Sequence, residues 1–113
     1  MKKDTTLPEG ITQEMIDKVL TYKKKEDVRL AELPKDDNGD ESLNVIVSVP
    51  TRVSMNEFEK WIDKNPGKAK EILLNSHLHS HKDEVKADDG LFAGAFDAIA
   101  QLIPVRKAVL KNL

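Results

Sequence analysis

The chain contains no cysteine and few aromatic residues, and these two absences limit the cross-links, metal sites and core packing that the protein can have. Without cysteine it has neither a disulfide framework nor a thiolate zinc site, a composition that fits a reducing compartment. Aromatic residues account for 4% of the 113 positions, so the core must be built mainly from aliphatic side chains. No run of 18 or more apolar residues occurs, and the polar start of the chain lacks the apolar stretch of a signal peptide. We therefore expect a cytoplasmic protein that neither crosses nor binds a membrane.

An excess of charge of one sign is also missing. The 18 Lys and Arg residues against 20 Asp and Glu residues give a formal charge of −2. No long basic stripe could follow a phosphate backbone, and acidic residues interleave with the lysines near residues 23–25. No aromatic platform for stacking bases is visible beside them. Nucleic acid is therefore not an expected partner.

The length and the pattern of the chain predict one domain after a short lead-in. Residues 1–10 have no periodicity and are expected to form a flexible N-terminal segment, with a single α+β domain over residues 11–113. Thr12 can cap a short amphipathic helix, and the lysines at 23–25 are expected in its last turn, where cations suit the helix dipole.

Two segments with a strand-like pattern follow this helix. Residues 28–33 read as one strand, and residues 43–49 read as a second, in which alternate apolar side chains form one clearly apolar face. The polar, turn-forming stretch 34–42 lies between them. This order predicts a β-hairpin.

The rest of the chain has a helical pattern. Ser54 and Glu57 match a capping box that would start one helix, and Asn65-Pro66-Gly67 would end it and let another begin. Residues 79–88 read as a polar connection, after which Asp88 or Asp89 can cap a long helix that continues until Pro104. The fold class predicted is α+β, a small hairpin or sheet packed with about four helices and a helical C-terminal half.

Three histidines alternate with other residues at His77, His79 and His81. Imidazoles bind zinc, nickel and copper, and an extended segment would place the three rings on one side. However, Ser80 stands where the known two-histidine hydrolase pattern has an aspartate before its third histidine. The alternatives are a metal site, a pH-responsive contact, and a loop of solvent-exposed histidines.

No residue pattern indicates catalysis or a bound cofactor. None of the serines lies in a nucleophile motif with a convincing base, so we expect no enzymatic activity and no cofactor. The apolar stripe of the last helix could be core, or it could bind another helix or a second copy of this chain. The candidate partner-binding residues share this helical face or the neighbouring tryptophan: Trp61, Leu91, Phe92, Phe96 and Ile99.

The order of the segments, rather than any single residue, carries a resemblance to a known family. An extended pair ends in Val49-Pro50-Thr51-Arg52, a capped helix carries Trp61, and Glu71-Ile-Leu-Leu-Asn-Ser-His-Leu follows. The chain continues with Ala87-Asp-Asp-Gly-Leu-Phe and then Ile103-Pro-Val-Arg-Lys-Ala-Val-Leu. Over residues 28–113 this pattern resembles small tail-assembly-chaperone-like proteins of tailed bacteriophages and prophages.

The resemblance implies a non-enzymatic protein in the host cytoplasm. Such a protein would bind a long, helical, aggregation-prone tape-measure protein and keep it competent for tail assembly. The family has no catalytic signature, so no catalytic residue is carried over.

Overall fold

The computed structural model describes residues 7–105 and 108–113, and within them the fold is α+β. A two-stranded antiparallel sheet packs with five α-helices and one 3-10 turn, as the sequence predicts in class. In chain order the elements are α1 (Gln13–Val19), η1 (Lys25–Asp27), β1 (Val28–Pro34), β2 (Ser42–Ser48), α2 (Arg52–Ile62), α3 (Pro66–His77), α4 (Lys82–Ala87) and α5 (Asp89–Gln101).

The predicted hairpin is confirmed. Strands β1 and β2 pair in a register that runs from Val28 opposite Ser48 to Pro34 opposite Ser42. The connecting loop is closed by a hydrogen bond from the backbone amide of Lys35 to the carbonyl of Glu41.

Strand β2 is paired along its second edge as well. Val47 forms an isolated antiparallel bridge with Leu78, and the amide of His79 donates to the carbonyl of Ile46 at 2.8 Å. The amide of Ile46 in turn donates to the side chain of Ser80. The segment after α3 therefore acts as a short third strand, and β2 lies at the centre of the sheet.

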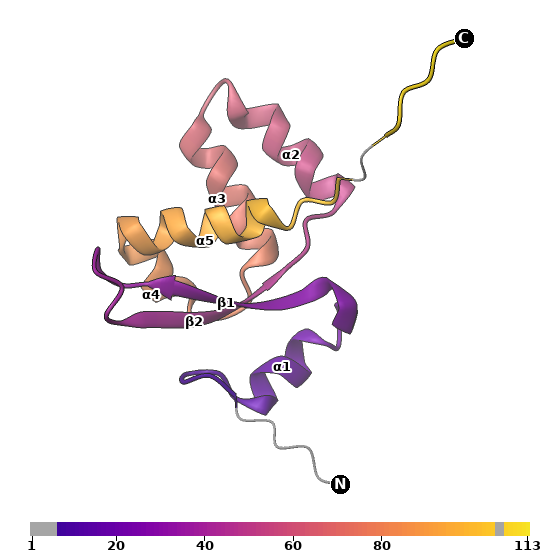
Figure 1. Ribbon diagram of the computed structural model, residues 1–113. Coiled ribbons are helices and arrows are strands. Elements are labelled where there is room, and N and C mark those ends of the chain that lie inside the picture. The colour runs from indigo at the N-terminus through magenta and orange to yellow at the C-terminus, as the bar shows by residue number, and fades with distance from the viewer. Residues whose placement is uncertain (1–6, 106–107) are drawn as a thin grey trace, which may run out of the picture.

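The predicted apolar face of β2 is confirmed, and its other face is covered as well. Val45 and Val47 join the main core with α3, α4 and α5, whereas Ile46 joins a smaller core with Ile11 and Val19 beside α1. Figure 1 shows α5 on one side of the hairpin and α1 on the other. Residues 45–48 are all buried as a result.

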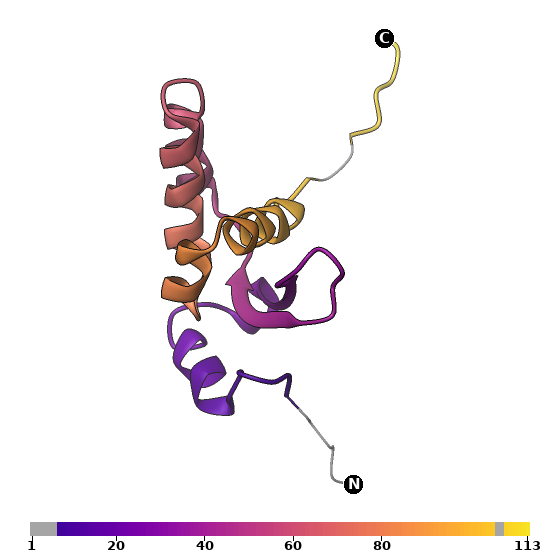
Figure 2. The same cartoon turned by 90° about the vertical axis from the view of Figure 1, so that its left-hand side faces the viewer.

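Helices α2 and α3 form an antiparallel pair that projects from the sheet (Figure 2). The cap of α2 is Thr51, whose side chain accepts from the amide of Ser54 while the Ser54 side chain accepts from the amide of Thr51. The predicted box of Ser54 and Glu57 is therefore wrong by three residues. Asn65 caps α3 and Pro66 occupies its first turn, as the break in the sequence predicts.

Three predicted boundaries also change. Helix α1 begins after its Thr12 cap but ends at Val19, so the lysines at 23–25 lie beyond it. The supposed connection at 79–88 contains α4, whose one buried residue is Val85. Helix α5 starts at the predicted cap Asp88 but stops at Gln101, before Pro104.

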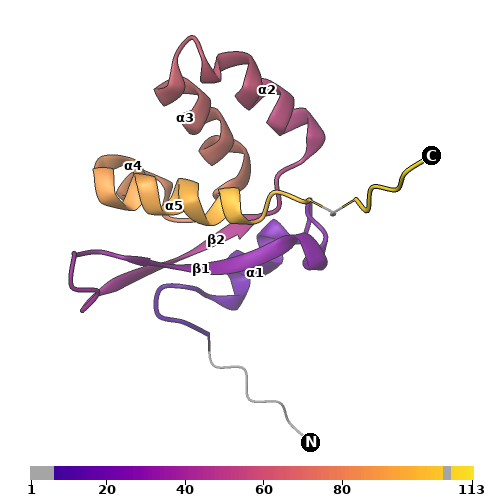
Figure 3. The same cartoon turned by 45° about the horizontal axis from the view of Figure 1, so that its top comes forward.

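The two ends of the chain differ in their contacts. Of the lead-in expected to be flexible, residues 1–6 lie outside the described part, whereas Leu7 and Pro8 are half-buried. Residues 108–113 are exposed and have no helix or strand, and Figure 3 shows this C-terminal segment leaving the body of the molecule.

Candidate functional site

His77 and His79 are brought together by the bridge between Leu78 and β2. Side chains alternate along an extended segment, so Leu78 enters the main core while its two neighbours turn to the opposite face. There the hydroxyl of Ser48 lies 2.9 Å from Nδ1 of His77 and 2.8 Å from Nε2 of His79. One buried serine therefore joins the two imidazoles.

Further hydrogen bonds extend this pair in both directions. Nε2 of His77 lies 2.6 Å from the hydroxyl of Ser54, which is also bonded to Thr51 at the start of α2. Nδ1 of His79 lies 3.2 Å from the hydroxyl of Tyr22, whose ring meets the imidazole edge to face. We call the chain Tyr22–His79–Ser48–His77–Ser54 the histidine–serine chain.

The protons of the histidine–serine chain can be ordered with both imidazoles neutral. If Tyr22 donates to His79, then His79 donates to Ser48, Ser48 to His77, and His77 to Ser54. The opposite order is equally complete, with Ser54 donating first. In either order each ring carries one proton and uses both nitrogens, so no polar atom of the chain is left unpaired.

Burial favours these neutral forms. It lowers the pKa of His77 from 6.5 to about 4, and the positive charge of Lys23 and the neighbouring His79 act in the same direction. Burial likewise lowers the pKa of His79 to about 4, with Lys23 and Lys82 adding repulsion. The prediction of a loop of exposed histidines is therefore wrong for these two residues.

The serine and histidine pairs do not form a hydrolytic site. Ser48 is fully buried and Ser54 is 6% exposed, so a substrate carbonyl cannot reach either hydroxyl. Each imidazole is also held between two hydroxyl groups, and among the described residues no carboxylate is hydrogen-bonded to either ring. The histidine–serine chain instead ties α2, β2 and the end of α3 together.

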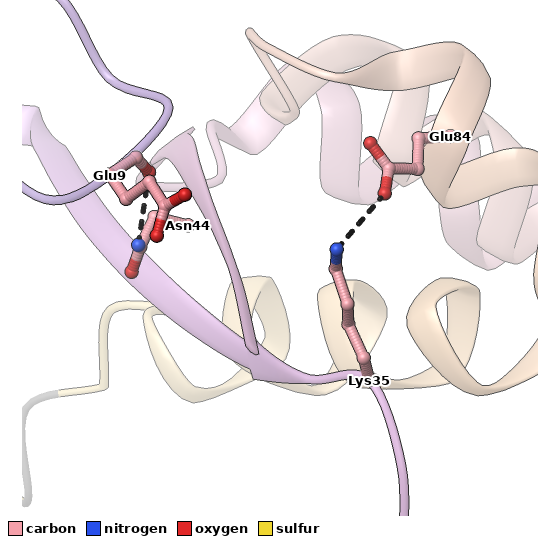
Figure 4. A network of polar contacts seen from close by, with 4 residues as sticks. All are labelled: Glu9, Lys35, Asn44 and Glu84. Carbon is pink, nitrogen blue, oxygen red and sulfur yellow. Dashed lines mark hydrogen bonds and ion pairs between the residues drawn. The ribbon is translucent and has the colours of Figure 1, made fainter. Parts of the chain in front are cut away.

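His81 lies apart from the other two histidines, so the three rings do not share one side. Its backbone is left-handed, with φ of 55°, which ends the extended run, and its ring contacts Ser80 and Gly10. It lines a polar cleft formed by the start of the chain, the hairpin loop and α4. Figure 4 shows two contacts across this region, Asn44 with the backbone of Glu9 and Lys35 with Glu84 at 3.7 Å.

The separation of His81 from His77 and His79 argues against a metal site formed by all three histidines. No group of three or more histidine or acidic side chains in the described part of the chain is placed to hold a metal ion. Two imidazoles already bonded to hydroxyl groups are a poor start for a zinc site, which needs at least three protein ligands.

The predicted partner-binding residues separate into two groups. Leu91 and Ile99 belong to the main core, at 4% and 0% exposed, so a partner cannot reach them while the domain is folded. Phe92, Phe96 and Trp61 are half-buried. Phe58 is not among the predicted partner-binding residues, but it is half-buried as well and packs against the main core.

Two of the half-buried aromatic rings contact each other, and lysines of α3 lie over two of the rings. The rings of Phe58 on α2 and Phe96 on α5 have their centroids 5.8 Å apart. The ammonium of Lys68 lies 3.6 Å from the ring centre of Trp61, and that of Lys70 lies 5.5 Å from the ring centre of Phe96. We call Phe58, Trp61, Phe92 and Phe96 the aromatic surface.

Comparisons with known proteins find no match. No protein-family model, no curated protein and no solved structure shows significant similarity to the chain. In the part of the chain that the structure describes, no helix combines the length and the apolarity that a membrane span requires.

Proposed function

We propose that this protein acts by binding another protein rather than by catalysis. The observation that carries the proposal is the position of its aromatic residues. All three phenylalanines and the one tryptophan are only half-buried, whereas every fully buried apolar side chain in the described residues is aliphatic. Large aromatic side chains usually dominate a core, and they are also enriched where one protein binds another.

The chemistry around the aromatic surface favours a helical partner. Phe58 of α2 and Phe96 of α5 lie ring beside ring, and Trp61 and Phe92 belong to the same two helices, which suits the apolar face of an amphipathic helix. Lys68 and Lys70 stand over the rings, so a partner helix with acidic residues beside its apolar stripe would gain charge complementarity.

Together with the resemblance in segment order, this surface supports a more specific proposal. The protein would be a tail-assembly chaperone of a tailed phage or prophage, acting in the host cytoplasm. It would cover apolar helical stretches of a tape-measure protein until the tail assembles.

The test is affinity capture with the tagged full chain from phage-infected or prophage-bearing cells, followed by mass spectrometry. The chaperone proposal predicts recovery of a long helical tail protein, and capture of that protein should fall at least tenfold for Trp61→Ala or Phe58→Ala, as loss of a central aromatic contact does. Val53→Ala is the matched control, because Val53 also lies on α2 but is 74% exposed and is not among the apolar residues packed against the core.

Thermal unfolding of each variant separates lost binding from lost structure. A folded Trp61→Ala protein that captures the same tail protein as the wild type would refute the assignment of the aromatic surface. Failure to recover any tail protein from a lysate that contains it would refute the chaperone proposal.

One observation supports the alternative function, a metal-binding or pH-responsive regulator that uses His77, His79 and His81. His77 and His79 share Ser48 in one buried chain, so a proton on either changes the bonding of both. This favours a response to pH over a response to metal. Calorimetry with zinc tests the metal form, and the wild type and His79→Gln should show equally little heat of binding.

A further inference from the structure

Unlike β2, strand β1 has no strand beside its outer edge within the described residues, although the side chain of Arg29 donates to the carbonyl of Val28 there. In an antiparallel pair, successive residues direct their backbone groups alternately toward the partner strand and away from it. The bonds from Lys35 to Glu41 and from Val49 to Asp27 show that odd-numbered residues of β1 face β2. The backbone groups of Leu30 and Glu32 therefore point outward, and within residues 7–105 and 108–113 they form no backbone hydrogen bond.

Grooves run along this edge on both faces of the hairpin. On one face, β1 and α5 border a groove whose apolar lining includes Ala31, Ala98 and Leu102. On the other face, β1 and α1 border a second groove, lined by Ile16, Leu20 and Leu30 among others. A strand added beside β1 would have both of its faces against protein, as β2 does.

A strand in that position needs a continuous apolar run rather than an alternating one. The centre of β2 meets this need with Val45-Ile46-Val47, which is buried on both faces. The C-terminal segment contains the corresponding run Ala108-Val109-Leu110, but here Val109 and Leu110 are 81% and 93% exposed. The fold thus leaves unused a segment with the pattern that the β1 edge requires.

Charge and length agree with this pairing. Residues 108–113 include Lys111 and no acidic residue, and Arg106 and Lys107 precede them in the sequence, whereas the groove beside α5 is lined by Glu32 and Asp97 as well as Arg29. Six extended residues span about 20 Å, which covers most of a seven-residue strand of about 23 Å.

We propose that the C-terminal segment of one copy, residues 108–113, adds as a strand to the open edge of β1 in a second copy. The proposal concerns a different surface from the aromatic surface and does not depend on the chaperone function. It assigns a self-association site to the chain, with Leu30 and Glu32 supplying the backbone hydrogen bonds.

The geometry favours a second copy over the same chain. Leu102 already lines the groove beside α5, so the segment would have to reverse direction between Ile103 and Val105 to reach its own β1. In Figures 1 and 3 residues 108–113 run away from the body of the molecule.

The test is light scattering after gel filtration of the full chain over a range of concentrations. We expect the mass of two or more chains at high concentration, and at least a tenfold weaker association for Leu110→Asp. Because Leu110 is 93% exposed, this change should leave the fold intact, and Val53→Asp is the matched control on an exposed valine of α2.

A second experiment identifies the edge directly. A peptide of residues 108–113 is added to the isotope-labelled Leu110→Asp protein, and the amide signals of Leu30, Glu32 and Ala98 are expected to shift. A monomer at every concentration with no peptide shifts would overturn the proposal, and so would an association that survives Leu110→Asp. Shifts confined to the aromatic surface, or a monomer whose segment contacts its own β1, would also overturn it.

Discussion

The two strands of the hairpin have the same length and very different surroundings. In β2, residues 45–48 are almost completely buried, and both edges and both faces are covered. In β1 only Leu33 is buried, and Leu30 remains 44% exposed although it lies directly opposite Ile46. The difference shows that position in the sheet, more than apolar composition, decides what each strand contributes.

This contrast assigns the strands different roles. Strand β2 joins the two cores and carries Ser48, so it holds the fold together. Strand β1 closes one side of the hairpin and leaves its other edge open, so it is the strand that can bind. Changes in β2 should therefore affect stability, and changes in β1 should affect association.

The largest effect is expected from Ile46→Ala. Ile46 lies on the face of β2 that packs against α1 and is fully buried there. Truncating its side chain to alanine should lower the free energy of unfolding by about 2–5 kcal/mol. The matched change Leu30→Ala on the exposed side of β1 should cost no more than about 1 kcal/mol. Denaturant unfolding measures both, and equal losses would contradict the division between the strands.

An effect of comparable size is expected from pH, at the end of β2 that carries Ser48. The pKa values of His77 and His79 lie at about 4 in the folded protein and near 6.5 in the unfolded chain, which therefore binds more protons between these values. Their contribution to stability is complete above pH 6.5 and is lost as the pH falls toward 4. At about 1.4 kcal/mol for each pH unit between 6.5 and 4, we expect a loss of about 3 kcal/mol for each of the two histidines.

Denaturant unfolding at several pH values follows this loss, and two histidine variants isolate it from the titration of carboxylates. His79→Gln should flatten the slope of stability between pH 6.5 and 4, because one of the two imidazoles is gone. His81→Gln should leave the slope unchanged, since His81 lies outside the histidine–serine chain. A slope equal in all three proteins would contradict the role of the buried imidazoles.

Local sequence rules predicted the parts of the fold that depend on neighbouring residues. The polar turn before β2, the Thr12 cap of α1 and the Asp88 cap of α5 all follow from side chains within a few positions. The predicted cap of α2 was wrong because Thr51 and Ser54 are each followed, three residues later, by a residue that can complete a capping box. The local sequence does not choose between the two positions. Helix α4 was missed because six residues with one buried side chain have no measurable period.

The candidate sites depend on contacts that local rules do not reach. His77 and Ser48 are 29 residues apart, and only the bridge from Leu78 to β2 shows which histidines share a face. One signal was available for the sheet, because the unbroken run Val45-Ile46-Val47 indicates a strand buried on both faces. The half-burial of Phe58, Phe92 and Phe96 could not be read from spacing, since core and interface stripes have the same period.

Amide hydrogen exchange along the hairpin tests most directly the claim that β1 is an open edge. In dilute solution the amides of Leu30 and Glu32 should exchange quickly, while those of Ala31 and Leu33, which face β2, and of Val45 and Val47 should exchange slowly. At high protein concentration the amides of Leu30 and Glu32 should become protected as a second copy binds. Slow exchange of these two amides in dilute solution, or fast exchange at every concentration, would contradict the account.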